Sequence, residues 1–174
     1  MGHHYVRVDD LAADIAEYDF TDRRTLQTIV EEVEMQRTLA LRLEGMARAA
    51  YTVTREAEVA DAKRTDIRLA AVRGNQKATI EIKIADKGWS VNELERALRG
   101  QLVGQYLCHE SCKAGCLLLT YNGDKKYWEH PGTGASMIFN ELIAHLDALA
   151  RTIEAEQNHA VRLSVRGVDL RNPS

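Results

Sequence analysis

The stretch that decides the fold is residues 65–84, which read TDIRLAAVRGNQKATIEIKI. Two runs with alternating apolar residues flank the Gly-Asn pair at residues 74–75, so the segment predicts two consecutive β-strands joined by a turn. Because alternate side chains of a strand share a face, the three isoleucines of residues 80–84 point one way and Glu81 and Lys83 the other.

A carboxylate and an amine therefore project together from a strand that is otherwise core. Charged side chains flanked so tightly by apolar residues need a partner, such as a metal ion or a phosphate. The alternative is a half-exposed strand on which Glu81 and Lys83 form a surface ion pair.

The rest of the chain alternates between helical and strand periodicity, which predicts an α/β protein. Helices are expected over residues 11–18, from Thr21 or Asp22 to Met46, from the capping box Ser90-Val91-Asn92-Glu93 to about Cys108, and over 137–153. Strands are expected over 51–59, 65–72, 78–84, 115–121 and 161–165.

Length and composition favour one domain that spans residues 1–174. The 174 residues, 45% of them hydrophobic, suffice for one sizeable core. No apolar run reaches membrane-spanning length and no signal peptide opens the chain, so we expect a cytoplasmic protein without a membrane partner. The histidine pair after Met1 is compatible with a chain excised from a longer protein.

The charge is unevenly distributed along the chain. The net charge is −3, yet residues 63–99 hold nine Lys or Arg and five Asp or Glu. A basic segment against an acidic remainder can hold a phosphate backbone, which favours a nucleic-acid partner.

Three cysteines recur every four residues, at Cys108, Cys112 and Cys116, with His109 beside the first. They could bind zinc, although structural zinc sites usually pair their cysteines at closer spacing and on turns. The other interpretation is a set of reduced, mostly buried thiols near a helix end, as a reducing compartment allows.

The helix after the capping box carries two glutamines in its apolar stripe. At about 100° per residue, Gln101 and Gln105 fall in the middle of the stripe that Leu94, Leu98 and Leu102 define. Buried amides must be hydrogen-bonded, so they either satisfy backbone groups of the sheet or face a wet site.

The order helix, strand with Asp66, strand with Glu81-x-Lys83, helix with Gln101 and Tyr106, then strand resembles the PD-(D/E)xK nuclease superfamily. The resemblance covers a core of about residues 25–121, and the C-terminal helix and strand at 134–168 follow it. It implies a restriction-endonuclease-like fold, in which a central mixed β-sheet is flanked by α-helices in the order αβββαβ.

The resemblance also implies a site. Asp66, Glu81 and the backbone carbonyl of Ile82 would be ligands of Mg²⁺ or Mn²⁺, Lys83 would be the catalytic lysine, and Gln101 would support the site from the helix.

The acidic position that many relatives carry on the first helix or strand would be Glu56, which we favour over Glu58. The sequence departs from the family pattern in two places. Thr65 stands where the family name has proline, and Tyr106 follows Gln101 by five residues where the RecB-like branch has four.

By the same resemblance, we expect a metal-dependent endonuclease domain that hydrolyses phosphodiester bonds in DNA, with RNA not excluded. Double-strand cutting by a single-site domain would favour a homodimer. The sequences around Glu81 and Gln101 resemble those of nuclease domains appended to large bacterial anti-phage defence proteins. If this resemblance holds, other domains of such a protein would be partners. The alternative is a catalytically inactive nucleic-acid-binding or assembly module with the same fold.

Overall fold

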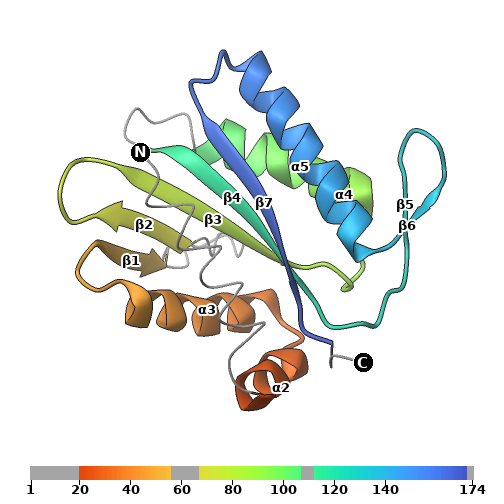
Figure 1. Ribbon diagram of the computed structural model, residues 1–174, viewed down its shortest axis with the longest axis horizontal. Coiled ribbons are helices and arrows are strands. Elements are labelled where there is room, and N and C mark those ends of the chain that lie inside the picture. The colour runs from red at the N-terminus through yellow and green to blue at the C-terminus, as the bar shows by residue number, and fades with distance from the viewer. Residues whose placement is uncertain (1–19, 56–66, 107–111, 172–174) are drawn as a thin grey trace.

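The computed structural model describes residues 20–55, 67–106 and 112–171. It is an α/β structure with a five-stranded mixed sheet, of strand order β1-β2-β3-β4-β7, flanked by helices (Figure 1), and the predicted α/β class is thus confirmed. The strands of the sheet are β1 Tyr51–Arg55, β2 Ile67–Ala71, β3 Lys77–Ile84, β4 Cys112–Tyr121 and β7 Arg162–Asp169. The helices are α2 Phe20–Thr28, α3 Glu32–Met46, α4 Val91–Arg96, the π-helix η1 Ala97–Tyr106 and α5 Phe139–Glu156. A separate hairpin consists of β5 Trp128–Glu129 and β6 Ser136–Met137.

The sheet combines an antiparallel and a parallel half. β1, β2 and β3 are successively antiparallel, whereas β4 pairs parallel to β3 and β7 pairs parallel to β4. Parallel neighbours need long crossovers, and these are supplied by α4 with η1 and by α5. From α3 to β4 the order is helix, three strands, helix and strand, as predicted.

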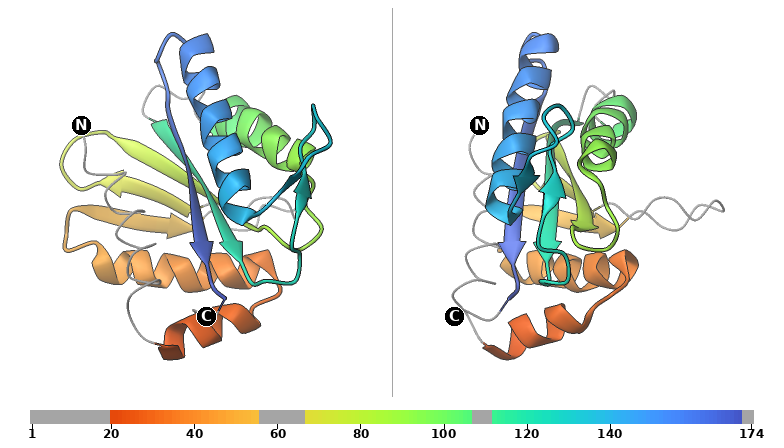
Figure 2. Two further views of the ribbon diagram at one scale, coloured as in Figure 1. Left: turned by 45° about the vertical axis from the view of Figure 1, so that its right-hand side comes forward. Right: turned by 90° about the vertical axis from the view of Figure 1, so that its right-hand side faces the viewer.

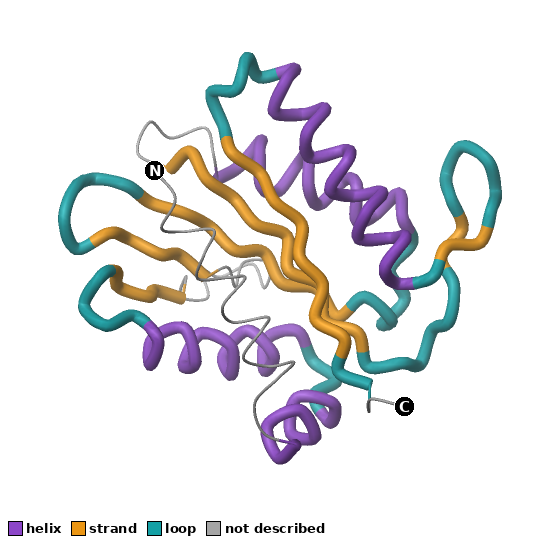
Figure 3. Tube along the Cα trace, viewed as in Figure 1, coloured by secondary structure: helices purple, strands orange, loops and turns teal. Residues whose placement is uncertain are grey.

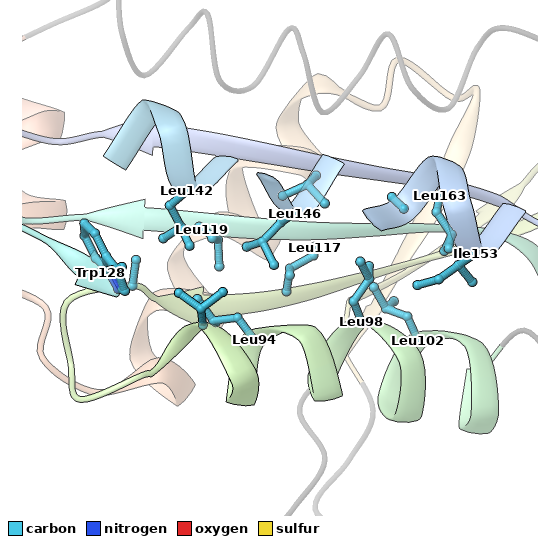
Figure 4. Packing of buried hydrophobic residues seen from close by; sticks show 14 of the residues in the cluster. Leu94, Leu98, Leu102, Leu117, Leu119, Trp128, Leu142, Leu146, Ile153 and Leu163 are labelled. Carbon is cyan, nitrogen blue, oxygen red and sulfur yellow. The ribbon is translucent and has the colours of Figure 1, made fainter. Parts of the chain in front are cut away.

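Apolar cores cover both faces of the sheet. On one face, the three isoleucines within residues 80–84 pack in a cluster with Leu39 and Leu43 of α3, which confirms the predicted alternation in β3. On the other face, leucines of β4 and β7 meet those of α4, η1 and α5 (Figure 4). Figure 2 shows α2 and α3 grouped at the bottom of the molecule and α4, η1 and α5 grouped at its top.

The predicted capping box opens α4. The Glu93 N–H donates to Ser90 Oγ at 3.3 Å, and the Ser90 N–H donates to the Glu93 carboxylate at 2.8 Å. After Arg96, however, the helix continues as the π-helix η1. A π-helix turns less per residue than the α-helical 100°, so the α-helical phase predicted for Gln101 does not hold. Gln101, predicted at the centre of the inward stripe, is only half-buried.

The N-terminal helical stretch is not continuous. The sequence predicts one helix from Thr21 or Asp22 to Met46, but the structure has α2 and α3, separated by residues 29–31. Apolar residues keep a helical spacing across this break, and Glu31 at the N-cap of α3 makes no side-chain cap hydrogen bond. Neither periodicity nor capping chemistry therefore marks the break.

Two further predictions need correction. The expected helix from Met137 begins only at Phe139, because Met137 belongs to β6 of an unpredicted hairpin. Cys112 and Cys116 are buried, as the second interpretation of the cysteines predicts, but they lie on β4 rather than near a helix end. Cys108 and His109 lie outside the described residues, so the zinc alternative stays untested.

Other predictions also concern residues that the structure does not describe. The helix expected over 11–18, the end of the strand expected over 51–59, and positions 65 and 66 belong to this group. In the part of the chain that is described, no helix is both long enough and apolar enough to cross a membrane.

Candidate functional site

Glu81 and Lys83 project from one face of β3 and form a buried ion pair. Glu81 Oε1 lies 2.8 Å from Lys83 Nζ, and the two residues are 3% and 7% exposed. They are buried because β3 is the central strand and both faces of the sheet are covered. The alternative of a surface ion pair is therefore wrong.

A third charged side chain, absent from the predicted site, joins this pair. Glu32 is the first residue of α3, and its Oε2 lies 3.4 Å from Lys83 Nζ. Its side chain is 24% exposed, so it is the member of the group most open to solvent. We call Glu32, Glu81 and Lys83 the charged cluster.

Figure 3 shows the strands of the sheet in orange. The charged cluster lies where β2 stops pairing with β3. The two strands pair from Lys77 to Ile80 of β3, and beyond Ile80 this edge of β3 has no strand partner in the described ranges. The Ile84 N–H points out of the same edge and donates to Glu32 Oε1 at 3.4 Å. Backbone groups two residues apart face the same edge, so the Ile82 carbonyl is directed toward the side on which Glu32 lies.

Lys83 is a cation in this environment. Burial acts to lower the pKa of Lys83, but the carboxylates of Glu81 and Glu32 outweigh it, and the pKa lies above its ordinary value. The ammonium can orient a ligand or stabilise negative charge, but it is not a proton acceptor near neutral pH.

Trp89, in the loop between β3 and α4, contacts the charged cluster as well. Its indole N–H donates to Glu32 Oε1 at 2.7 Å. The ring centroid lies 4.8 Å from Lys83 Nζ, within the range of a cation–π interaction. Sequence periodicity does not single out a loop residue such as Trp89.

The remaining predicted carboxylates, Asp66, Glu56 and Glu58, lie outside the described residues. Asp66 directly precedes Ile67 in the sequence, and Ile67 pairs with Ile80. In the described ranges, no group of three or more His, Cys, Asp or Glu side chains is arranged to hold a metal ion. The role of Asp66 therefore stays a prediction.

Gln101 lies on η1, and its Oε1 is buried without a hydrogen-bond partner in the described part of the chain. No hydrogen bond there links it to Glu81 or Lys83. Its predicted support of the site stays a prediction, and so does the role of Gln105, whose side chain is not described.

The basic segment is partly neutralised in space. Lys87 pairs with Asp124 at 2.8 Å, and Arg99 pairs with Glu156 at 2.7 Å. Both acidic partners come from a distant part of the sequence. A local charge count therefore overstates the positive surface. Arg73, Lys77 and Arg96 are exposed.

Comparison of the chain with protein-family models, with curated proteins and with solved structures finds no match. The chemistry of the site therefore has to be argued from its own residues. The charged cluster holds two carboxylates around one ammonium, at a stretch of β3 edge that no described strand covers. This arrangement can bind a cation or an anionic ligand.

Proposed function

We propose that the chain is a metal-dependent nuclease domain of the PD-(D/E)xK type, with a restriction-endonuclease-like fold. The observation that carries the proposal is the burial of the charged cluster at an edge of the central strand that has no strand partner in the described ranges beyond Ile80. Burying ion pairs is seldom worth its desolvation cost, and apolar replacements are often as stable. A buried charged group of this kind is therefore a candidate functional site.

The donor set of the cluster fits a hard divalent cation. Glu32 and Glu81 supply carboxylate oxygens, and the Ile82 carbonyl is directed toward the same edge of β3. Oxygen ligands are what Mg²⁺ and Mn²⁺ prefer. Asp66 would complete the proposed set, because it directly precedes Ile67 in the sequence and Ile67 pairs with Ile80, the neighbour of Glu81.

In the proposed reaction a bound Mg²⁺ would supply an activated water and neutralise charge on the phosphoryl oxygens. Lys83 would orient the attacking water or stabilise the negative charge on the phosphoryl oxygens in the transition state. Its raised pKa keeps Lys83 cationic for this task. Glu32 and Glu81 would hold the metal, and Gln101 would support the site from η1.

The proposed substrate is DNA, with RNA not excluded. Arg73, Lys77 and Arg96 are exposed. They support this choice, because exposed cations can contact a phosphate backbone. We also propose a homodimer for double-strand cutting, and a place in a larger bacterial defence protein.

A second candidate is a catalytically inactive nucleic-acid-binding or assembly module with the same fold. One observation favours it. Lys83 already lies within 3.4 Å of oxygens from both Glu32 and Glu81, so the cluster could serve only to join α3 to β3.

Plasmid cleavage tests the proposal. With Mg²⁺ or Mn²⁺ the purified chain should nick or cut DNA, and EDTA should stop the reaction. Lys83→Ala and Glu81→Gln should each lower the rate by roughly 10²–10³-fold or more. The control is Lys113→Ala, since Lys113 is exposed on β4.

Equal cleavage by wild type and Lys83→Ala would indicate a contaminating nuclease and contradict the proposal. Metal-independent binding of nucleic acid without any cleavage would favour the second candidate.

A further inference from the structure

Trp89 contacts two of the three members of the charged cluster. Its indole N–H donates to Glu32 Oε1 at 2.7 Å, and its ring centroid lies 4.8 Å from Lys83 Nζ. A hydrogen bond to a carboxylate is charge-assisted and stronger than a neutral one. One oxygen of Glu32 is thus held by Trp89, while the other, Oε2, faces Lys83.

The loop that carries Trp89 is hydrogen-bonded to the segment that follows β4. Asp86, three residues earlier and 7% exposed, accepts hydrogen bonds from the backbone N–H groups of Asn122 and Asp124 at 3.3 and 2.7 Å. Lys125 Nζ donates to the backbone carbonyl of Trp89 at 2.8 Å. The indole is therefore presented from a well-anchored loop, and it can restrict the carboxylate it holds to one orientation.

We propose that Trp89 is a positioning residue of the metal site, which fixes Glu32 through Oε1 so that Oε2, the oxygen that now faces Lys83, is presented to the cation. This inference rests on the proposed function. Groups that hydrogen-bond to metal ligands orient them, and their loss typically costs roughly 10–100-fold in metal affinity. Trp89→Phe removes the N–H while keeping an aromatic ring beside Lys83.

Trp128 offers a matched control. It is 1% exposed, and its Nε1 has no hydrogen-bond partner in the described part of the chain. Trp128→Phe therefore makes the same chemical change without removing a hydrogen bond to the charged cluster. The chain has two tryptophans, so each variant also leaves one fluorescent reporter, at the site or away from it.

The experiment measures Mn²⁺ binding by calorimetry for wild type, Trp89→Phe, Trp128→Phe, Glu32→Gln and the double variant Trp89→Phe/Glu32→Gln. Circular dichroism confirms folding of each. We expect Trp89→Phe to weaken Mn²⁺ binding roughly 10–100-fold and Trp128→Phe to leave it unchanged. In the Glu32→Gln background, Trp89→Phe should add little, because it acts through Glu32.

Fluorescence gives a second readout. Mn²⁺ should quench the emission of Trp89 in Trp128→Phe with the same concentration dependence as the calorimetric binding, and it should leave Trp128 in Trp89→Phe much less affected.

Two results separate the inference from the function on which it rests. A wild type that binds Mn²⁺ and cleaves DNA, with Trp89→Phe binding equally well, overturns the role of Trp89 alone. An equal loss from Trp89→Phe in the wild-type and Glu32→Gln backgrounds also overturns it. A wild type that neither binds Mn²⁺ nor cleaves DNA overturns both proposals.

Discussion

Replacing Lys83 with methionine removes the ammonium of the charged cluster and keeps most of the aliphatic side chain. The ammonium lies 2.8 Å from Glu81 and 3.4 Å from Glu32. If these carboxylates form a cation site, a metal ion should take over part of the role of the missing charge. The variant should therefore be destabilised without Mg²⁺ and rescued by it.

The size of both effects can be worked from the structure. Breaking a buried ion pair by removing one partner costs about 3–5 kcal/mol, and the lower value applies here because the Glu32 side chain is 24% exposed. In a chain of 174 residues, a loss of about 3 kcal/mol lowers Tm by roughly 6–12 °C. Mg²⁺ at about 100 times its Kd would return about 2.7 kcal/mol.

Wild type should respond less to Mg²⁺ than the variant. The ammonium of Lys83 repels an incoming cation, by about 4 kcal/mol per unit charge at about 4 Å and an effective dielectric constant of about 20 before any relaxation. Lys83→Met should thus bind Mg²⁺ more tightly than wild type while cleaving DNA far more slowly.

Thermal and urea unfolding with and without Mg²⁺ measure these differences. The control is Lys113→Met, because Lys113 is exposed on β4; its stability should change by less than about 0.5 kcal/mol, and its response to Mg²⁺ should match that of wild type. A destabilised Lys83→Met that Mg²⁺ does not rescue would refute the cation site and leave the cluster as an ion-pair network.

Three further predictions concern other parts of the molecule. Gln101→Ala should slow DNA cleavage more than it lowers Tm, measured on the same samples; a large loss of Tm with an unchanged rate per molecule would make Gln101 structural. Gly167→Ala should destabilise the fold by about 1–3 kcal/mol in urea unfolding, because an added Cβ would lie 2.8 Å from Ile143; an unchanged midpoint would show that α5 can shift from β7. Burial acts to raise the pKa of Asp169, but hydrogen bonds from Arg171 outweigh it and the pKa is lowered. This pair therefore stabilises the fold above the unfolded-state pKa of about 3.9, and the contribution is lost as pH falls through the folded-state pKa. Asp169→Asn should cost about 0.2–1 kcal/mol at neutral pH, since the Asp169 side chain is 39% exposed, and the difference from wild type should shrink in acid. A difference that stays constant down to acid pH would contradict this assignment.

The central sheet could be predicted because its strands carry strong local signals. The alternation within residues 80–84 assigns the faces of β3, and the capping box at Ser90 marks the start of α4. The break before α3 could not be predicted, because apolar spacing continues through residues 29–31. The π-helix could not be predicted either, because α-helical and π-helical turns place leucines on similar faces over a few residues.

The site could be predicted in part. Glu81 and Lys83 follow from strand alternation alone. Glu32 could have been predicted from the sequence. It shares a helical face with Gln36 and Leu39, which are 4% and 0% exposed, and an acidic residue at the start of a buried helical face indicates a special role. Trp89 could not have been predicted, since its contacts depend on the conformation of a loop.

The most direct test of the account is a crystal structure of the protein soaked in Mn²⁺ and measured at a wavelength where Mn²⁺ scatters anomalously. We expect one strong anomalous peak beside Glu81, with oxygen ligands from Glu32 and Asp66 and with Lys83 Nζ outside the coordination shell. An anomalous map with no peak at the charged cluster, while Lys83 still joins Glu81 to Glu32, would contradict it.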